Sequence, residues 1–330
     1  MTGPIDELLG LAGPHPAFIP TEPVRFSVIV RTQGIRPTSL REALESLEDQ
    51  THPAHQILVM THTDDDDLVE EIRALSTDVS TIVEIWQVAS GLRTAPLNAG
   101  LDAATGDYVC FLDDDDLARR DWLSAFALAV QAHPGQIARA RTGVQQWSTE
   151  GTGEPRHPNG PVVEPFATSF DLLAHLSHNE TPICSIAVPL GALRHYGIRF
   201  ADDLPVLEDW DFLMRIAPLT GVISIDAQTS LYRQLDDGNA FAAETVETWQ
   251  LAHARVVDRL AAQPLLLPAG DARRIASAHF EPGGGSRHES DLAEIAAELD
   301  RLTKSPLRWG RRFGARVTDA ARVRIGGLRR

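Results

Sequence analysis

Four consecutive aspartates, Asp113–Asp116, follow an apolar run with the composition of a buried strand. Adjacent carboxylates repel one another and are costly near an apolar core, so a positive partner is expected beside them. In extended backbone, side chains alternate, which lets Asp113 and Asp115 face one side while Asp114 faces away. Two carboxylates at that spacing suit a hard cation such as Mg²⁺ or Mn²⁺, which completes its shell with water and substrate phosphates.

The same residues also have a structural interpretation. Asp116 can cap a helix over residues 117–130, whose N-terminal dipole favours negative charge. A cap accounts for one or two of the aspartates and leaves the others unexplained. A calcium loop of the EF-hand kind fits poorly, because the glycine required at its sixth position is Ala118 here. The metal site and the helix cap both stay open at this point.

Two further acidic groups lie at predicted helix starts. Asp64–Asp67 fall in the first turn of a helix over 66–75, and we expect them to be solvated and to complement its dipole. Glu208 and Asp209 begin a helix that presents apolar residues on one face: Trp210, Leu213, Met214 and Ala217. From these residues alone, Asp209 is an N-cap worth about 1 kcal/mol.

The elements that must position these acids alternate between strand and helix. Strands are predicted over 25–30, 56–60, 81–86 and 107–112, and helices over 39–50, 66–75 and 97–104. Continuous apolar strands separated by helices indicate an α/β fold, with a mostly parallel sheet covered on both faces. Ligands bind beyond the carboxyl ends of such strands, which is where the four aspartates lie.

The second half of the chain is patterned differently. A Gly- and Pro-rich stretch at 148–161 predicts a long hairpin or loop, and further strands are predicted over 183–188, 221–225 and 229–233. Beyond Asp236 the chain reads as helical. We expect an N-terminal extension (1–24), a catalytic domain (25–235), a helical extension (236–280), and a linker with a basic tail (281–330).

Charge and cysteine content narrow the function. A formal charge of -16 argues against general nucleic-acid binding. Residues 301–330 are the exception, with ten Lys and Arg against one Asp; this tail is expected to contact either an anionic membrane surface or the acidic body of the protein. We expect a cytoplasmic protein, because the sequence has two isolated cysteines, no recognisable signal peptide and no apolar stretch long enough to span a bilayer. If the basic tail contacts a membrane, that contact is expected to be peripheral, at the inner face.

Several motifs in order resemble the family 2 inverting glycosyltransferases, which have the A-type, Rossmann-like glycosyltransferase fold. The resemblance covers about two-thirds of the chain, from Phe26 to Arg233. Its pieces are "FSVIVRT", "LREALESLEDQTHPAHQILVM", "LNAGLDAATGDYVCFLDDDD", "LEDWDFLMRIA" and "LYR". The resemblance implies a donor that is a nucleotide-diphosphate-sugar, an acceptor hydroxyl on a glycan or lipid-linked molecule, and a setting in cell-surface glycan synthesis.

The resemblance also implies residue roles. Asp113 lies near the ribose or sugar diphosphate, Asp115 (with Asp113) binds Mn²⁺ or Mg²⁺, and Asp209 is the general base. Residues at the strand ends are expected to line the nucleotide cleft: Thr32, Thr61 and Asn98. Because Asp209 starts a helix, we expect its pKa to be low.

Departures from the family pattern occur at three places. Thr61 or His62 stands where an aspartate usually contacts the nucleobase, and Leu97 stands where an arginine is common. Leu235, followed by Asp236 and Asp237, stands where the family often has a histidine near the metal; either one of these aspartates substitutes as the ligand, or the third protein ligand is absent. Two alternatives remain beside the glycosyltransferase: a nucleotidyltransferase, which lacks a glycine-rich, basic phosphate loop here, and a catalytically silent nucleotide-sugar-binding module.

Overall fold

The computed structural model describes residues 15–76, 83–150, 154–235, 245–267 and 270–279. The chain divides into two compact units at residue 270, and the described part of the second unit is one helix, α11 (Asp271–His279). The expected N-terminal extension lies partly outside the described residues, as does the start of the helical extension, and the linker and basic tail lie outside them entirely. The predicted domain boundaries therefore stay predictions.

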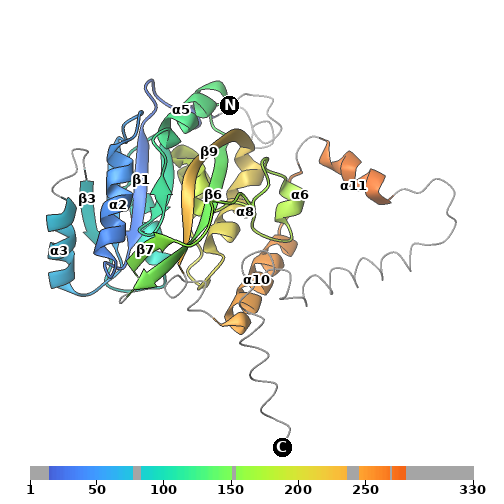
Figure 1. Cartoon of the computed structure of the whole chain (residues 1–330). Helices are drawn as coiled ribbons and strands as arrows, with labels where there is room; N and C mark the ends of the chain where they lie inside the picture. The colour runs from blue at the N-terminus through green and yellow to red at the C-terminus, as the bar shows by residue number, and fades with distance from the viewer. Residues whose placement is uncertain (1–14, 77–82, 151–153, 236–244, 268–269, 280–330) are drawn as a thin grey trace, which may run out of the picture. The chain divides into compact units, whose positions relative to one another are not determined.

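A nine-stranded mixed sheet forms the centre of the first unit (Figure 1). The four strands predicted in the first half of the chain run parallel, as expected. Their order in the sheet is β3-β2-β1-β4: β3 (Val83–Gln87), β2 (Gln56–Thr61), β1 (Phe26–Thr32) and β4 (Tyr108–Asp113). Antiparallel pairing then joins β8 (Ile186–Pro189) to β4, and β6 (Ile137–Glu150) to β8. The predicted α/β class is confirmed, with a sheet that is parallel on one side and mixed on the other.

The far side of the sheet is built on two long strands. β9 (Val222–Leu235) runs parallel to β6, and the predicted hairpin is formed by β6 with β7 (Glu154–Pro158). The prediction of two separate strands over 221–225 and 229–233 is wrong. A shift in register at Ala140–Thr142 accommodates the intervening residues as an irregularity, so β9 continues through them as one strand.

Alternate side chains of β1 and β4 enter two different cores. Val28, Val30, Cys110 and Leu112 pack with α2 (Pro37–Glu48), α3 (Asp66–Ser76) and α5 (Trp122–Ala132). Ile29, Val109 and Phe111 pack on the other face with α4 (Ala95–Ala103), α7 (Leu190–Tyr196) and α8 (Glu208–Thr220). The period of two along each strand therefore places helices on both faces, as predicted.

The remaining short elements connect these layers. They are η1 (Pro16–Phe18), α6 (Leu172–His175), η2 (Ile183–Ser185) and α10 (Val246–Ala261), which packs on α8. In the described part of the chain, no helix combines the length and apolar character needed to cross a bilayer.

Acidic residues precede two helices in the first half of the chain, α5 and α3. The helix expected directly after Asp116 is wrong, because Leu117–Ala118 form a short strand, β5, that pairs with β9, and α5 begins only at Trp122. The other acidic run, Asp64–Asp67, lies at the start of α3, as predicted. Asp65 Oδ1 accepts hydrogen bonds from the backbone N–H groups of Asp67 and Leu68, and so caps α3.

Asp107 joins the N-terminal segment to the amino end of β4. Its Oδ2 accepts from the backbone N–H groups of Thr21 (3.1 Å) and Arg25 (2.9 Å), and Arg25 Nη2 donates to Oδ1 at 2.8 Å. Burial opposes ionisation, but the bonds from Arg25 and Thr21 outweigh it and leave the pKa of Asp107 lowered.

Asp107→Asn should lower the free energy of unfolding at pH 7 by about 1–3 kcal/mol, because the charge-assisted bonds are lost. A carboxyl with a lowered pKa stabilises the fold above its unfolded pKa and loses that contribution as pH falls through its folded pKa. The difference from wild type should therefore shrink below about pH 4 in urea titrations. Exposed Asp64→Asn is the control, and equal stability of Asp107→Asn and wild type at pH 7 contradicts the role of the charge.

Candidate active site

The four aspartates lie at the carboxyl end of β4, next to the end of β1. Asp113 is the last residue of β4 and is the register partner of Arg31. The alternation assumed from the sequence does not apply to the next residues, because the chain turns and the Asp116 N–H donates to the Asp113 carbonyl at 3.0 Å. Asp114–Asp116 are buried, whereas 25% of the Asp113 side chain is exposed.

Arg31 is the first cation that compensates these charges. Its Nε and Nη2 bind the two carboxylate oxygens of Asp113 at 2.9 and 2.6 Å. Its Nη1 donates to Oε1 of Glu208 at 3.0 Å. The bidentate contact between Arg31 and Asp113 is the strongest geometry available to a guanidinium and a carboxylate. Burial raises the pKa of the Asp113 carboxyl, but the charge and hydrogen bonds of Arg31 outweigh it and leave that pKa lowered.

Arg36 compensates the next two acids. Its Nη2 binds Asp114 Oδ1 at 2.9 Å, and its Nη1 lies 3.2 Å from Asp115 Oδ2. The hydroxyl of Thr32 also donates to Asp114, at 2.5 Å. Burial nevertheless raises the pKa of Asp114 to about 7, against the charge of Arg36, and it raises the pKa of Asp115 as well.

Arg233 is a third, fully buried cation behind the aspartates. Its Nε donates to the Asp115 carbonyl, its backbone N–H donates to Asp116 Oδ1 at 3.1 Å, and its Nη1 binds Glu42. The guanidinium also lies over the ring of Trp147, 5.3 Å from the centroid. Three arginines from different parts of the chain therefore stabilise the four carboxylates at the edge of the core.

Glu208 and Asp209 occupy the start of α8, but they face different partners. The Glu208 carboxylate binds Arg31 and also Arg93, whose Nε lies 2.8 Å from Oε1. Asp209 Oδ1 accepts from the Trp210 N–H at 2.7 Å, and Oδ2 accepts from Asn179 Nδ2 at 3.0 Å. Glu208 is buried, whereas Asp209 remains partly exposed.

Two sequence interpretations of Asp209 need correction. It is not the N-cap, because Leu207 holds that position with a left-handed φ of 64°. Its pKa is also not low. Burial and the neighbouring Glu208 charge raise the pKa of Asp209 to about 7, and the backbone N–H and two arginine charges only partly oppose the shift. Further along the same helix, Asp211 forms an ion pair with Arg215, one turn on, at 2.6 Å.

The three residues predicted to line the nucleotide cleft have different environments. Thr32 and Thr61 are register partners at the ends of β1 and β2. Thr32 binds Asp114, whereas the Thr61 hydroxyl is buried and has no hydrogen-bond partner among the described residues. Asn98 lies on α4, where it donates to the Phe200 carbonyl (2.9 Å) and to Asp202 Oδ1 (3.1 Å) and so anchors the 200–202 segment. Their nucleotide contacts stay predictions.

Comparison with known proteins decides the family. Residues 27–187 match the model of the family described as glycosyl transferase family 2. The chain is also 25% identical, over 234 residues, to the uncharacterised glycosyltransferase YwdF of Bacillus subtilis (strain 168), which covers 67% of this chain and 78% of YwdF. Residues 27–187 are a family 2 glycosyltransferase domain. The predicted family and enzyme class are confirmed.

Solved structures show the same fold. A TarS fragment from S. aureus in complex with UDP-GlcNAc superposes with a TM-score of 0.53 at 20% identity, over 69% of this chain and 65% of that fragment. A mannosyltransferase from Pyrobaculum calidifontis in complex with GDP-Man and Mn²⁺ gives a TM-score of 0.53 at 15% identity, over 98% and 86% of the two chains. The A-type glycosyltransferase fold predicted from the motifs is therefore confirmed.

The arginines around the four aspartates were not predicted from the sequence. Arg31 and Arg36 lie in "RTQGIRP", a segment with one glycine that does not form the glycine-rich phosphate loop of a nucleotidyltransferase. Arg93 lies one helical turn before Leu97, the position where the family commonly has arginine, and Leu97 itself is buried in the core. A signal for the first two existed, since two cations next to the end of β1 are the obvious partners for acids at the end of β4.

The predicted metal site is represented by two carboxylates in the described part of the chain. No cluster of three or more His, Cys, Asp or Glu side chains that could hold a metal occurs within the described ranges. The carboxylates of Asp113 and Asp115 fit a hard cation, although both are bound to arginine. Asp236 and Asp237, the predicted substitutes for a third ligand, lie outside the described residues.

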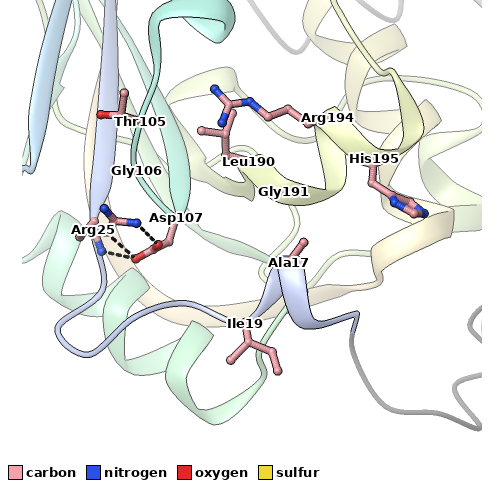
Figure 2. A pocket seen from close by; sticks show the side chains of 10 residues that line it. All are labelled: Ala17, Ile19, Arg25, Thr105, Gly106, Asp107, Leu190, Gly191, Arg194 and His195. Carbon is pink, nitrogen blue, oxygen red and sulfur yellow. Dashed lines mark hydrogen bonds and ion pairs between the residues drawn. The ribbon is translucent and has the colours of Figure 1, made fainter.

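A separate hollow of about 520 Å³ lies at the opposite, amino-terminal edge of β1 and β4 (Figure 2). Its charged residues already have partners: Arg25 binds Asp107, and Arg194 donates to the Ala104 carbonyl. It contains none of the predicted site residues, and we assign it no role in the reaction.

The buried cation Arg233 gives a prediction about stability. Arg233→Met should lower the free energy of unfolding by about 3–5 kcal/mol, because the Asp115 carbonyl and the Glu42 carboxylate lose their buried guanidinium partner and buried Asp116 loses a favourable neighbouring charge. Urea denaturation at pH 7 measures the effect. Arg120→Met is the matched control, since 71% of that side chain is exposed, and it should change stability by about 0.5 kcal/mol or less. Equal losses in the two variants contradict the charge-compensation argument.

Proposed function

We propose that the protein is a metal-dependent, inverting glycosyltransferase that moves a sugar from a nucleotide-diphosphate-sugar to an acceptor hydroxyl. The acceptor is a glycan or a lipid-linked molecule, and the setting is cell-surface glycan synthesis. The observation that carries the proposal is the environment of Asp209: a partly exposed carboxylate, held on both oxygens, with its pKa raised to about 7. That pKa lies where a general base works best at neutral pH.

The donor is bound at the ends of β1 and β4. Asp115 and Asp113 would hold Mn²⁺ or Mg²⁺ together with the donor diphosphate. The cation supplies Lewis-acid neutralisation of the charge that develops on the leaving diphosphate. A cation at Asp113 would compete with Arg31, which binds both oxygens of that carboxylate. Complexes of TarS with UDP-GlcNAc and of the mannosyltransferase with GDP-Man and Mn²⁺ support a donor of this class.

The acceptor is activated by Asp209. Its carboxylate accepts the proton of the acceptor hydroxyl while that oxygen attacks the anomeric carbon from the face opposite the leaving group. One carboxylate on that face is sufficient to invert the configuration, by the same geometric logic as in inverting hydrolases. Glu208 cannot share this role in the observed geometry, because its carboxylate is buried and bound to two arginines.

The alternatives are affected unequally. The family match excludes the nucleotidyltransferase. A catalytically silent nucleotide-sugar-binding module has the same fold and the same donor contacts, so it is separated from an enzyme only by turnover. A thermal-shift panel of nucleotide sugars identifies the donor for such assays, because specific binding raises the melting temperature.

Asp209→Asn should reduce release of nucleoside diphosphate from the bound donor by roughly 10²–10⁴-fold, with donor affinity near wild type. The amide keeps the size and the acceptor oxygen of the carboxylate, so the fold should survive. In wild type the rate should fall as pH drops below about 7, because the base must be ionised to accept a proton. If Asp209→Asn keeps more than a tenth of the wild-type rate while chemistry limits turnover, the base lies elsewhere.

Glu208→Gln is the companion variant. It removes a charge that binds Arg31 and Arg93 but leaves Asp209 in place, so we expect a loss of turnover smaller than that of Asp209→Asn. A larger loss in Glu208→Gln reverses the assignment of the two roles.

Asp115→Ala should abolish donor-induced thermal stabilisation and turnover together, and a chelator should stop turnover in wild type. Metal binding, measured calorimetrically with Mn²⁺, should be weak alone and tighter with the nucleoside diphosphate, because the phosphates supply part of the ligand shell. Asp64→Ala in the second acidic run is the control. Undiminished turnover in the presence of chelator refutes the metal.

The cytoplasmic location and the contact of residues 301–330 with an anionic membrane stay predictions from the sequence. The basic tail lies outside the described residues, so the structure adds nothing for or against them.

A further inference from the structure

Asn179 is the side chain that binds the proposed base. It lies between α6 and η2, thirty residues before Asp209, and its Nδ2 donates to Asp209 Oδ2 over 3.0 Å. The other oxygen of that carboxylate accepts the backbone N–H of Trp210 at 2.7 Å. Two donors from two different elements therefore fix the plane of the carboxylate.

The orientation of the Asn179 amide follows from its second contact. The backbone N–H of Thr181 donates to Asn179 Oδ1 at 2.9 Å. An N–H can only be received by the carbonyl oxygen of the amide, so the NH₂ group must be the end that faces Asp209. The pairing of an NH₂ donor with a carboxylate favours the ionised form of the acid.

A buried arginine anchors the loop that carries Asn179. Arg139 on β6 is 1% exposed, and its Nε donates to the Thr181 hydroxyl at 2.8 Å. Its Nη2 donates to the carbonyls of Glu180 and Ala167, both at 2.8 Å. His175 Nε2 also lies 2.8 Å from the Thr181 hydroxyl. Burying a guanidinium is costly, and here it holds the backbone on which Asn179 sits.

Other titratable groups surround the start of α8 without contacting the Asp209 carboxylate. They come from every element packed against the start of α8: Glu208 on α8 itself, Arg31 on β1, Arg93 before α4, Tyr232 on β9, His175 on α6, and Arg259 on α10, which binds Asp211. Burial lowers the pKa of His175 to about 4 and raises that of Tyr232, so both are neutral at pH 7. The remaining groups, Glu208 and the three arginines, supply a constant electrostatic background, so a change in the pKa of Asp209 on substitution of Asn179 reports the contribution of Asn179.

We propose that Asn179 is a positioning residue that orients the Asp209 carboxylate toward the acceptor hydroxyl and keeps it ionised, held in place by Arg139 and Thr181. The inference rests on the proposed role of Asp209 as base. The two hydrogen bonds of Asn179 do not involve the aspartates at the end of β4, so donor binding should not depend on Asn179.

The first test measures the pKa of Asp209 without any substrate. In protein labelled with ¹³C-aspartate, the Asp209 carboxyl signal is identified by its loss in Asp209→Asn and followed from pH 4 to 9. Asn179→Ala should raise its pKa by about one unit, because a hydrogen bond to the ionised form is removed. Asn179→Asp, the isosteric variant, should raise it further through like-charge repulsion. Exposed Asn159→Ala is the control and should leave it unchanged.

The second test measures turnover as a function of pH, with UDP-GlcNAc and GDP-Man as donor probes and water as acceptor. At pH 7, Asn179→Ala should release nucleoside diphosphate about five- to tenfold more slowly, since a base whose pKa moves from about 7 to about 8 is mostly protonated there. The loss should shrink at pH 9. A purely structural role predicts a loss that does not depend on pH.

The outcomes separate the two proposals. If the pKa of Asp209 is unchanged in folded Asn179→Ala and Asn179→Asp, the positioning role is wrong, independently of which reaction the protein catalyses. If the Ala variant does not fold, the Asp variant alone decides this test. If Asp209→Asn retains more than a tenth of the wild-type rate, the proposed base fails, even though Asn179 still sets its pKa.

Discussion

The contact that the site depends on is the guanidinium of Arg31, which binds Asp113 with two nitrogens and Glu208 with the third. It connects the end of β4 to the start of α8, two segments separated by about ninety residues of sequence. Arginine stays charged under all conditions in which the protein folds, so the connection does not depend on pH. Removing it would leave two groups of carboxylates facing one another at the edge of the sheet, with Arg36, Arg93 and Arg233 left to compensate them.

Much of the first half of the fold could be predicted from the sequence, because each strand there is a short apolar run bounded by a helix with clear periodicity. The failures occurred where long-range pairing overrides local pattern. Leu117–Ala118 look like the start of a helix but pair with β9, which delays α5 to Trp122. The long strand β9 looks like two strands, because its pattern is interrupted where its register with β6 shifts.

The candidate site was predictable in its acids and not in its cations. Asp113–Asp116 and Asp209 stand out locally, whereas the partner of Glu42 is Arg233, 191 residues away, and nothing in the spacing connects them. The pKa of Asp209 was predicted in the wrong direction for a related reason. A helix start predicts a low pKa, but burial and the charge of Glu208 are tertiary effects and exceed the contribution of the helix. Asn179 lies in no recognisable motif, and its proposed role depends on a loop that Arg139 holds.

Charge balance in the described site supports the proposal that a metal accompanies the donor. Four arginines (Arg31, Arg36, Arg93 and Arg233) face six acids (Asp113–Asp116, Glu208 and Asp209). Burial raises the pKa values of Asp114, Asp116 and Asp209, and the neighbouring carboxylates raise them further. A diphosphate adds further negative charge to a site whose cations are already engaged. Its binding therefore requires either additional protons or an additional cation, and only the cation leaves Asp209 ionised and able to act as a base. The proposed metal dependence and the proposed base are in this way linked through the same excess of acids.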